Sequence, residues 1–162
     1  HHPKEFDVVL TSTLKRTKET VALFTESGIP SEEHATINEI GWGMHEGKSS
    51  NPEMREEYRR VTSAWKQGQF ELRVGGGESA LEMMERLQVF IRHIKERSED
   101  RILVCSHGRA MRGLMALLKF DDMTKMDLIR HHNTGLYLVE QQTDGFRFIL
   151  ENDLTHLESL DG

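Results

Sequence analysis

The chain has 162 residues, the size of one ordinary domain, and 36% of them are hydrophobic, which is enough for a buried core. Its formal net charge of −6 argues against binding to nucleic acid or to a membrane surface, because such proteins normally present a basic face. No apolar run reaches roughly 18 residues, and the single cysteine, Cys105, excludes an internal disulfide and multi-cysteine metal sites. We therefore expect one soluble, cytoplasmic domain.

The first half of the chain alternates between strand and helix signals. Residues 6–12 form a short β-branched run, which predicts a strand. A helical pattern follows, in which apolar residues recur every three or four positions until a glycine and a proline end it. Residues 34–40 are typical of a short extended segment. A polar stretch, 41–77, contains one predicted helix at 52–66.

The second half continues this alternation. A glycine triplet precedes the clearest helix, which the apolar spacing predicts over 79–97 with a serine cap. Residues 101–107 contain a continuous apolar run, typical of a strand that is covered on both faces, and a further helix follows. Two late strands at 134–142 and 146–152 are expected to form an antiparallel hairpin. This order predicts an α/β fold with helices packed on a mixed sheet.

Ligands of such sheets bind beyond the carboxyl ends of the strands, so two positions in this sequence are candidate ligand-binding sites. His107 follows the apolar strand and precedes the helix that Gly108 opens, where free amide groups favour an anion. Arg16 lies in the first turn of a helix, where a cation is favourable if an anion shares the site. The alternatives are a histidine that only hydrogen-bonds at a strand end and a solvated surface arginine.

Other polar residues are more ambiguous. Glu39 lies near apolar neighbours, where partial burial would raise its proton affinity and suit it to general acid catalysis, although an exposed loop carboxylate is the alternative and Glu46 competes. His131 and His132 lack metal-ligand spacing and are interpreted as loop residues. Cys105 is interpreted as a small core residue.

Several motifs occur together in the order and spacing of the histidine phosphatase superfamily, the group that resembles phosphoglycerate mutase. They are Thr-Ser-x-Leu-x-Arg-Thr at 11–17, Asn-Glu-Ile at 38–40 with Glu46-Gly47 behind it, Gly-Glu-Ser at 77–79 and Val-Cys-Ser-His-Gly at 104–108. The resemblance covers residues 6–157. It implies a single domain over 1–162, a three-layer α/β/α fold with a mostly parallel mixed sheet, and a substrate lid at 41–77.

The resemblance also implies an activity. Arg16 and His107 match the residues that bind the transferred phosphoryl group, with Gly108 beside them, and Glu39 matches the acid that protonates the leaving oxygen. Arg73 in the lid is expected to bind a second anionic group. The implied function is a metal-independent phosphomonoester phosphatase that works through phosphohistidine, without a cofactor, on a small phosphorylated metabolite. Phosphoglycerate mutase activity, or a noncatalytic module that binds a phosphorylated ligand, is the alternative.

The chain departs from the family in one respect. The family's first strand ends in Arg-His-Gly, whose histidine becomes phosphorylated, and this motif does not occur in the 162 residues. We therefore expect an upstream segment to supply the first strand and the nucleophile, and we expect the 162 residues alone to be inactive. The sequence leaves open whether the protein is a homodimer.

Overall fold

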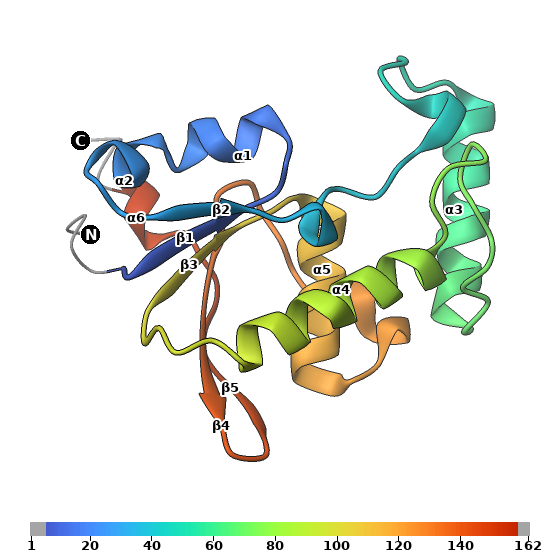
Figure 1. The fold of residues 1–162 in the computed structure, drawn as a ribbon. Coiled ribbons are helices and arrows are strands. Elements are labelled where there is room, and N and C mark those ends of the chain that lie inside the picture. The colour runs from blue at the N-terminus through green and yellow to red at the C-terminus, as the bar shows by residue number, and fades with distance from the viewer. Residues whose placement is uncertain (1–5, 159–162) are drawn as a thin grey trace.

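The computed structural model describes residues 6–158, and its centre is a parallel sheet of three strands (Figure 1). The strands are β1 (Val8–Thr11), β2 (Ser31–Glu33) and β3 (Ile102–Cys105). Strand β1 lies in the middle and pairs in parallel with both neighbours, so that Thr11 lies opposite Glu33 and Cys105. All three strands therefore end at the same edge of the sheet.

The helices of the described range are α1 (Lys15–Thr20), α2 (Ala22–Glu26), α3 (Pro52–Lys66), α4 (Ala80–Lys95), α5 (Gly108–Phe120) and α6 (Thr155–Glu158). All but α3 lie around this sheet, on both of its faces (Figure 1). Helices α1 and α2 lie on one side, whereas Val8 and Leu10 of β1 share the main core with α4 and α5 on the other (Figure 1). The predicted α/β/α layering is confirmed. None of the helices within residues 6–158 is long and apolar enough to cross a membrane.

The longer helices form where the apolar periodicity predicts them. Helix α3 has the predicted bounds, and the Asn51 side chain caps it by accepting from the Met54 backbone N–H at 2.8 Å. Helix α4 begins at a capping box, in which Ser79 and Glu82 each accept a hydrogen bond from the other's backbone N–H. These local signals fix where each helix starts, and burial of one face against the core stabilises it.

The late strands form a separate sheet, which differs from the single mixed sheet that the sequence predicts. Strands β4 (Leu136–Gln142) and β5 (Gly145–Asp153) pair with each other in an antiparallel hairpin. Within residues 6–158 the outer edge of β3 has no strand partner. The four residues of β3 are accordingly only half-buried, although their continuous apolar run predicts a strand that is covered on both faces.

Three further sequence predictions are wrong in detail. The extended segment expected at 34–40 does not form a strand. Strand β2 ends just before it, at Glu33, and a 3₁₀ turn, η2 (Ala35–Ile37), follows. The first predicted helix is divided at Val21, whose backbone (φ −102°, ψ 9°) leaves the helical region. The predicted core residue Cys105 is half-buried, and burial raises the pKa of its thiol, so the thiol is protonated at neutral pH.

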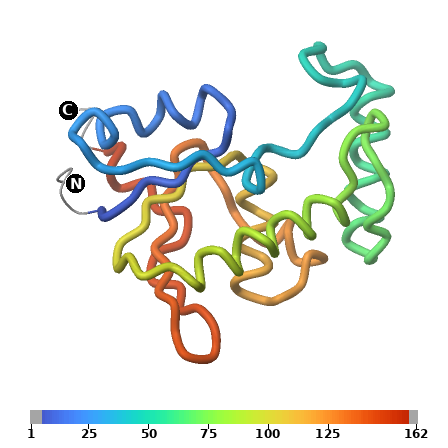
Figure 2. Tube along the Cα trace, in the orientation of Figure 1, coloured from blue at the N-terminus to red at the C-terminus, as the bar shows by residue number. Residues whose placement is uncertain are grey.

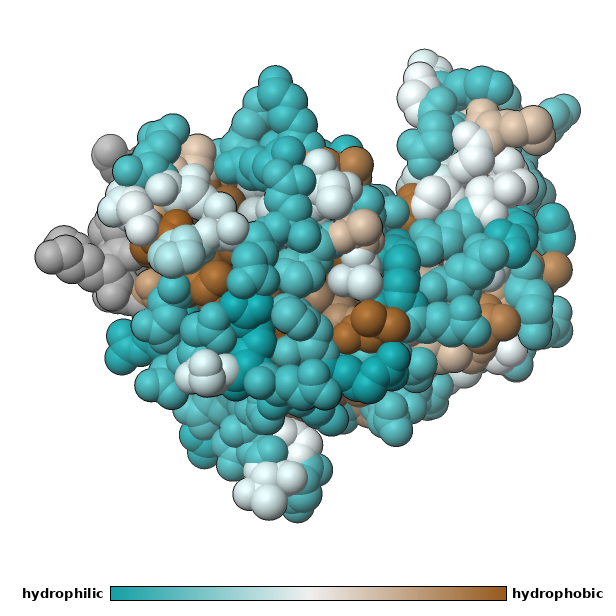
Figure 3. All heavy atoms as spheres, in the orientation of Figure 1, coloured by the Kyte–Doolittle hydropathy of each residue, from teal (hydrophilic) through white to brown (hydrophobic). Residues whose placement is uncertain are grey.

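Residues 41–77 form a lobe that stands apart from the sheet (Figure 2). It contains α3, a 3₁₀ turn η3 (Gly43–His45) and the glycine triplet that leads into α4. Figure 3 shows this lobe at the upper right, separated from the rest of the face by a hollow, and polar residues cover most of this side of the molecule. Trp65, 1% exposed, packs the lobe into the main core.

Candidate functional site

His107 stands where strand β3 ends and helix α5 begins, and it is 6% exposed. Its Nδ1 accepts a hydrogen bond from Arg16 Nε at 3.0 Å, since a guanidinium can only donate. Nε2 therefore carries the proton and donates to Ser12 Oγ at 2.7 Å. Burial, and then the charge of Arg16, lowers the pKa of His107 below its usual 6.5. The ring is consequently neutral at pH 7.

Ser12 contacts the other ring nitrogen of His107 and was not among the site residues predicted from the sequence. It directly follows β1 and is fully buried. Its Oγ accepts from the Leu14 backbone N–H at 3.1 Å and lies 2.9 Å from Thr17 Oγ1. This network fixes the hydroxyl and, with Arg16, the tautomer of His107. The available signal was a serine just beyond the carboxyl end of a buried strand.

Arg16 lies in the first turn of α1, and its side chain is exposed. Apart from the bond from Nε to His107, its guanidinium makes no hydrogen bond to another residue in the described range 6–158. Its two terminal amino groups can therefore bind two oxygens of a phosphate together. The structure brings Arg16 and His107 into contact, as their positions beyond two neighbouring strands predict.

Glu39 caps helix α5. Its Oε2 accepts from the Arg109 backbone N–H at 3.1 Å, and its Oε1 accepts from that of Ala110 at 3.0 Å. Oε2 lies 3.8 Å from the position that a Cβ on Gly108 would take. The amides that the sequence assigns to a phosphate beside Gly108 are thus occupied by a carboxylate. A phosphate and Glu39 compete for the same end of α5.

The segment that carries Glu39 is attached to the sheet. Ser106, directly after β3, donates from its hydroxyl to the Ile37 carbonyl oxygen at 2.7 Å. Ile37 and Ile40, on either side of Glu39, are at most 1% exposed. These contacts hold the carboxylate against α5, so Arg16, Glu39 and His107 gather at one edge of the sheet.

His131 also reaches this edge, although the sequence analysis interprets it only as a loop residue. Its Cδ2 lies 3.7 Å from the position of a Cβ on Gly108, beside Oε2 of Glu39. Its Nδ1 is buried and has no hydrogen-bond partner in the described part of the chain. Burial, and then the charge of Arg112, lowers the pKa of His131. Its sequence neighbours give no periodic signal that could have identified it.

A buried arginine joins the lobe of residues 41–77 to helix α5. Arg109, 9% exposed, donates to Asp127 Oδ1 at 2.7 Å and to the hydroxyl of Tyr58 on α3. Asp127 belongs to the 3₁₀ segment η4 (Met123–Leu128). Because the Arg109 backbone N–H is bonded to Glu39, one residue connects the lobe with the site.

A cavity of about 380 Å³ opens beside Tyr58 in this lobe. Its lining includes Trp42, Arg55 and Arg59.

Arg73 is engaged by the protein itself. Its guanidinium binds both oxygens of Glu82, at 2.6 and 2.8 Å, and donates to the Gly77 carbonyl at 2.8 Å. The hydrogen bonds from Arg73 lower the pKa of Glu82 to about 2. Arg73 therefore connects the glycine turn to the start of α4, rather than presenting a free charge to the anionic group that the sequence analysis expects it to bind.

The neutral state of His107 predicts a loss of stability in acid. Because its pKa is lowered in the folded chain, the unfolded state binds more protons below the ordinary pKa of 6.5. The stabilising contribution is complete above that value and is lost as the pH falls through the folded pKa. We expect the free energy of unfolding, measured in urea, to fall as the pH is lowered below about 6.5. His107→Gln should reduce this fall, whereas the exposed His132→Gln should not. Equal falls in all three proteins would contradict the prediction.

The contact between residues 41–43 and the glycine triplet predicts a second effect. A Cβ on Gly77 would overlap the carbonyl oxygen of Gly41 and the backbone nitrogen of Gly43. Gly77→Ala should therefore lower the free energy of unfolding by about 1–3 kcal/mol, measured in urea. Gly41→Ala is the matched control, since its Cβ meets Glu78 at an ordinary 3.7 Å. Equal stability of the two variants would show that the backbone of residues 41–43 can move away from a methyl group at position 77, and would contradict the prediction.

Comparison with known proteins identifies the family. Residues 2–154 match the model of the histidine phosphatase superfamily (branch 1), and the chain belongs to this family. A 2,3-bisphosphoglycerate-dependent phosphoglycerate mutase from Methylobacterium radiotolerans is 32% identical over 120 residues, covering 70% of this chain and 56% of that protein. The corresponding enzyme of Methylorubrum populi is 30% identical, covering 74% and 58%. The chain thus spans little more than half the length of these relatives.

Solved structures share the fold. The α-ribazole phosphatase from Shigella flexneri superimposes with a TM-score of 0.76 at 23% identity, covering 91% of this chain and 74% of that one. A mycobacterial glucosyl-3-phosphoglycerate phosphatase, solved with inorganic phosphate, gives a TM-score of 0.75 at 16% identity, covering 93% and 78%. At these identities the likeness establishes the fold alone, which is that of the histidine phosphatase family.

Proposed function

We propose that the whole protein is a metal-independent phosphatase of small phosphomonoesters that works through phosphohistidine. The observation that carries the proposal is the contact between Arg16 and His107 at the carboxyl edge of the sheet, with Glu39 at the start of α5 beside them. Family membership supports the same reaction class. Transfer of a phosphoryl group needs positioning and positive groups around its oxygens, and these residues supply both.

Arg16 and His107 bind the phosphoryl group in this proposal. The free amino groups of Arg16 bind two of its oxygens. When a phosphate dianion arrives, its charge favours protonation of His107, whose Nδ1 then donates to a phosphate oxygen once Arg16 Nε has turned toward the anion. The His107 ring, which is buried and neutral without a ligand, thus becomes a second positive group beside Arg16 when the phosphate binds.

The nucleophilic histidine is proposed to come from a segment upstream of these residues. The outer edge of β3 has no strand partner within residues 6–158, and its apolar residues are only half-buried. An unpaired edge of this kind accepts a further strand. A parallel strand added there would end beside His107, which is where an imidazole must lie to attack a phosphorus atom held by Arg16.

The lobe of residues 41–77 is proposed to act as the substrate lid. Its cavity lies beside Tyr58, whose hydroxyl accepts from Arg109, and Arg109 in turn bonds to Glu39 through its backbone. The cavity lining combines the aromatic ring of Trp42 with the positive charges of Arg55 and Arg59. This lining suits the organic part of a phosphorylated metabolite.

The test uses the whole protein and the 162-residue chain in parallel. The whole protein is expected to hydrolyse an aryl phosphate in the presence of a chelator and to form an acid-labile phosphoenzyme, whereas the 162 residues form none. An absolute need for metal, or turnover by the 162 residues alone, would overturn the proposal. Because the curated relatives are mutases, 3-phosphoglycerate is tested as well. Conversion of 3-phosphoglycerate into 2-phosphoglycerate in excess of phosphate release would favour the mutase reaction.

A further inference from the structure

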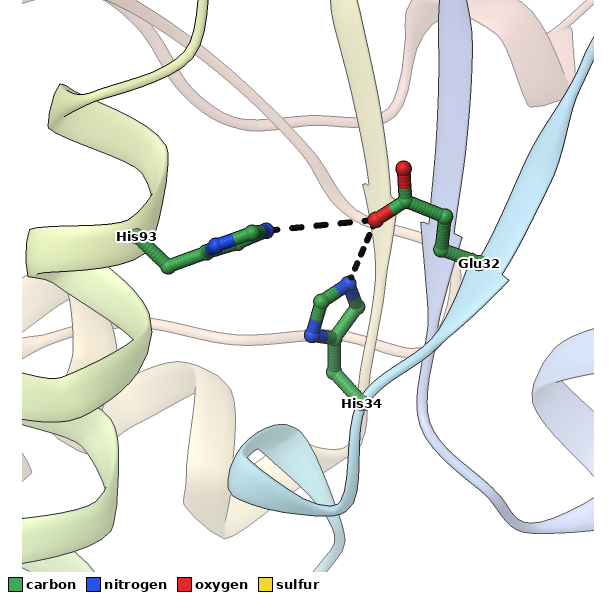
Figure 4. A group of neighbouring side chains, drawn as sticks. All are labelled: Glu32, His34 and His93. Carbon is green, nitrogen blue, oxygen red and sulfur yellow. Dashed lines mark hydrogen bonds and ion pairs between the residues drawn. The ribbon is translucent and has the colours of Figure 1, made fainter.

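Three potential metal ligands converge outside the site described above (Figure 4). Glu32 lies on β2, His34 lies just beyond the end of that strand, and His93 reaches toward them from α4. Glu32 Oε2 is 3.1 Å from His34 Nε2 and 3.9 Å from His93 Nε2. All three ligand atoms lie within 4.8 Å of one another. The spacing of these residues in the sequence gives no metal motif, since His93 comes from a distant helix.

Two members of this cluster, Glu32 and His93, already hold a cation, the guanidinium of Arg97. His34 Nε2 instead donates to Glu32 Oε2, because a carboxylate can only accept. Arg97 NH1 donates to Glu32 Oε2 at 2.8 Å and lies 2.9 Å from His93 Nε2. Because a guanidinium cannot accept, His93 Nε2 is the acceptor and is unprotonated, which is the form that binds a metal. The cluster therefore provides a carboxylate oxygen and an imidazole nitrogen that together face one positive group.

Arg97 has a second anionic partner. Its Nε and NH2 donate to the two oxygens of Glu99, at 3.1 and 2.5 Å. If another cation took the position between Glu32 and His93, Arg97 would keep a bidentate partner and its charge would stay paired. Displacement of Arg97 from Glu32 is consequently less costly than the exposure of an unpaired charge.

We propose that Glu32, His34 and His93 form a binding site for a transition-metal ion of the Zn²⁺ type, with Arg97 as the competing cation. Two imidazoles and one carboxylate are a ligand set that suits Zn²⁺, whereas Mg²⁺ and Ca²⁺ prefer oxygen alone. Bonds of 2.0–2.1 Å in a tetrahedral site place ligand atoms about 3.3 Å apart. Glu32 Oε2 and His34 Nε2 are 3.1 Å apart, close to this separation, and a metal would bind as the proton that His34 Nε2 donates to Glu32 is released. His93, whose side chain is 40% exposed, closes the remaining gap by a small rotation.

A metal at this position would join the end of β2 to helix α4. The segment after His34 continues through η2 to Glu39, so the ion would secure the base of the segment that carries the candidate acid. Binding to the folded state raises its stability, since the unfolded chain does not hold the three ligands together. The proposal is independent of the phosphatase reaction and concerns binding alone.

The test is a calorimetric titration of the whole protein with Zn²⁺ near neutral pH, with the melting temperature measured in parallel. His1 and His2 are first replaced by alanine, because two adjacent histidines can bind metal by themselves. We expect one site, and a rise in melting temperature on adding Zn²⁺. His93→Gln should weaken binding about tenfold or more. His132→Gln, a histidine outside the cluster, should leave the affinity unchanged.

Arg97→Gln provides the sharpest comparison, since it removes the competing cation and leaves all three ligands in place. It should tighten Zn²⁺ binding, whereas a site elsewhere would not respond. Co²⁺ in place of Zn²⁺ should give the visible absorption of tetrahedral coordination, and His93→Gln should remove it. Unchanged Zn²⁺ affinity in His93→Gln, weaker or unchanged binding in Arg97→Gln, or loss of all binding with His1 and His2 would overturn the proposal.

Discussion

Replacing Glu39 with glutamine is expected to lower the turnover of the whole protein by about 10²–10⁴-fold, the usual contribution of general acid–base catalysis. Glutamine keeps the shape of the side chain, and its carbonyl oxygen can accept from Ile40 and Ala110 as Glu39 Oε1 does. It cannot give a proton to the leaving oxygen or take one from water. Steady-state kinetics with an aryl phosphate should therefore show a fall in kcat with a much smaller change in KM.

Glu46→Gln is the matched control for this prediction. Glu46 accepts from the Trp42 backbone N–H at 2.6 Å and closes the loop around η3, and it makes none of the hydrogen bonds that hold Glu39 on the amides of α5. Its replacement should leave kcat within a few-fold of the unchanged protein. Full activity of Glu39→Gln together with a large loss in Glu46→Gln would move the role of acid to Glu46.

Trp65→Ala is expected to produce the largest loss of stability, about 3–5 kcal/mol in the free energy of unfolding. The indole is 1% exposed, and its Nε1 donates to the Leu72 carbonyl oxygen at 3.0 Å. Truncation creates a cavity between α3 and the main core and also removes this hydrogen bond. Urea or thermal unfolding, followed by circular dichroism, measures the change.

Two variants separate the cavity from other causes. Leu23→Ala removes an apolar side chain that is 68% exposed and should change stability by only about 0.5 kcal/mol. Trp65→Phe refills most of the cavity without the indole N–H, so it should recover most of the loss. If Trp65→Ala were no less stable than Leu23→Ala, the lobe of residues 41–77 would not be part of the cooperative core.

The helices with strong apolar periodicity were predictable from the sequence. The bounds of α3 are those predicted, and α4 and α5 begin at the serine cap and the glycine that mark them. Each of these signals is local, since it depends on residues within one or two turns. Strand β2 has no such signal, because Ser-Glu-Glu carries no apolar pattern and becomes a strand through its pairing with β1.

The sequence by itself determined the family, the longer helices, the strands β1 and β3, and the positions of Arg16 and His107 beyond those strands. Only the tertiary structure decided the protonation and the hydrogen-bond partners of these side chains. The tautomer of His107 arises from Arg16 and Ser12, which are 91 and 95 residues away in the sequence. Its lowered pKa arises from burial and then from the charge of Arg16. The position of Glu39 on the amides of α5 likewise joins residues about 70 positions apart. Charge state and hydrogen bonding depend on neighbours in space, and folding brings those neighbours from distant parts of the chain.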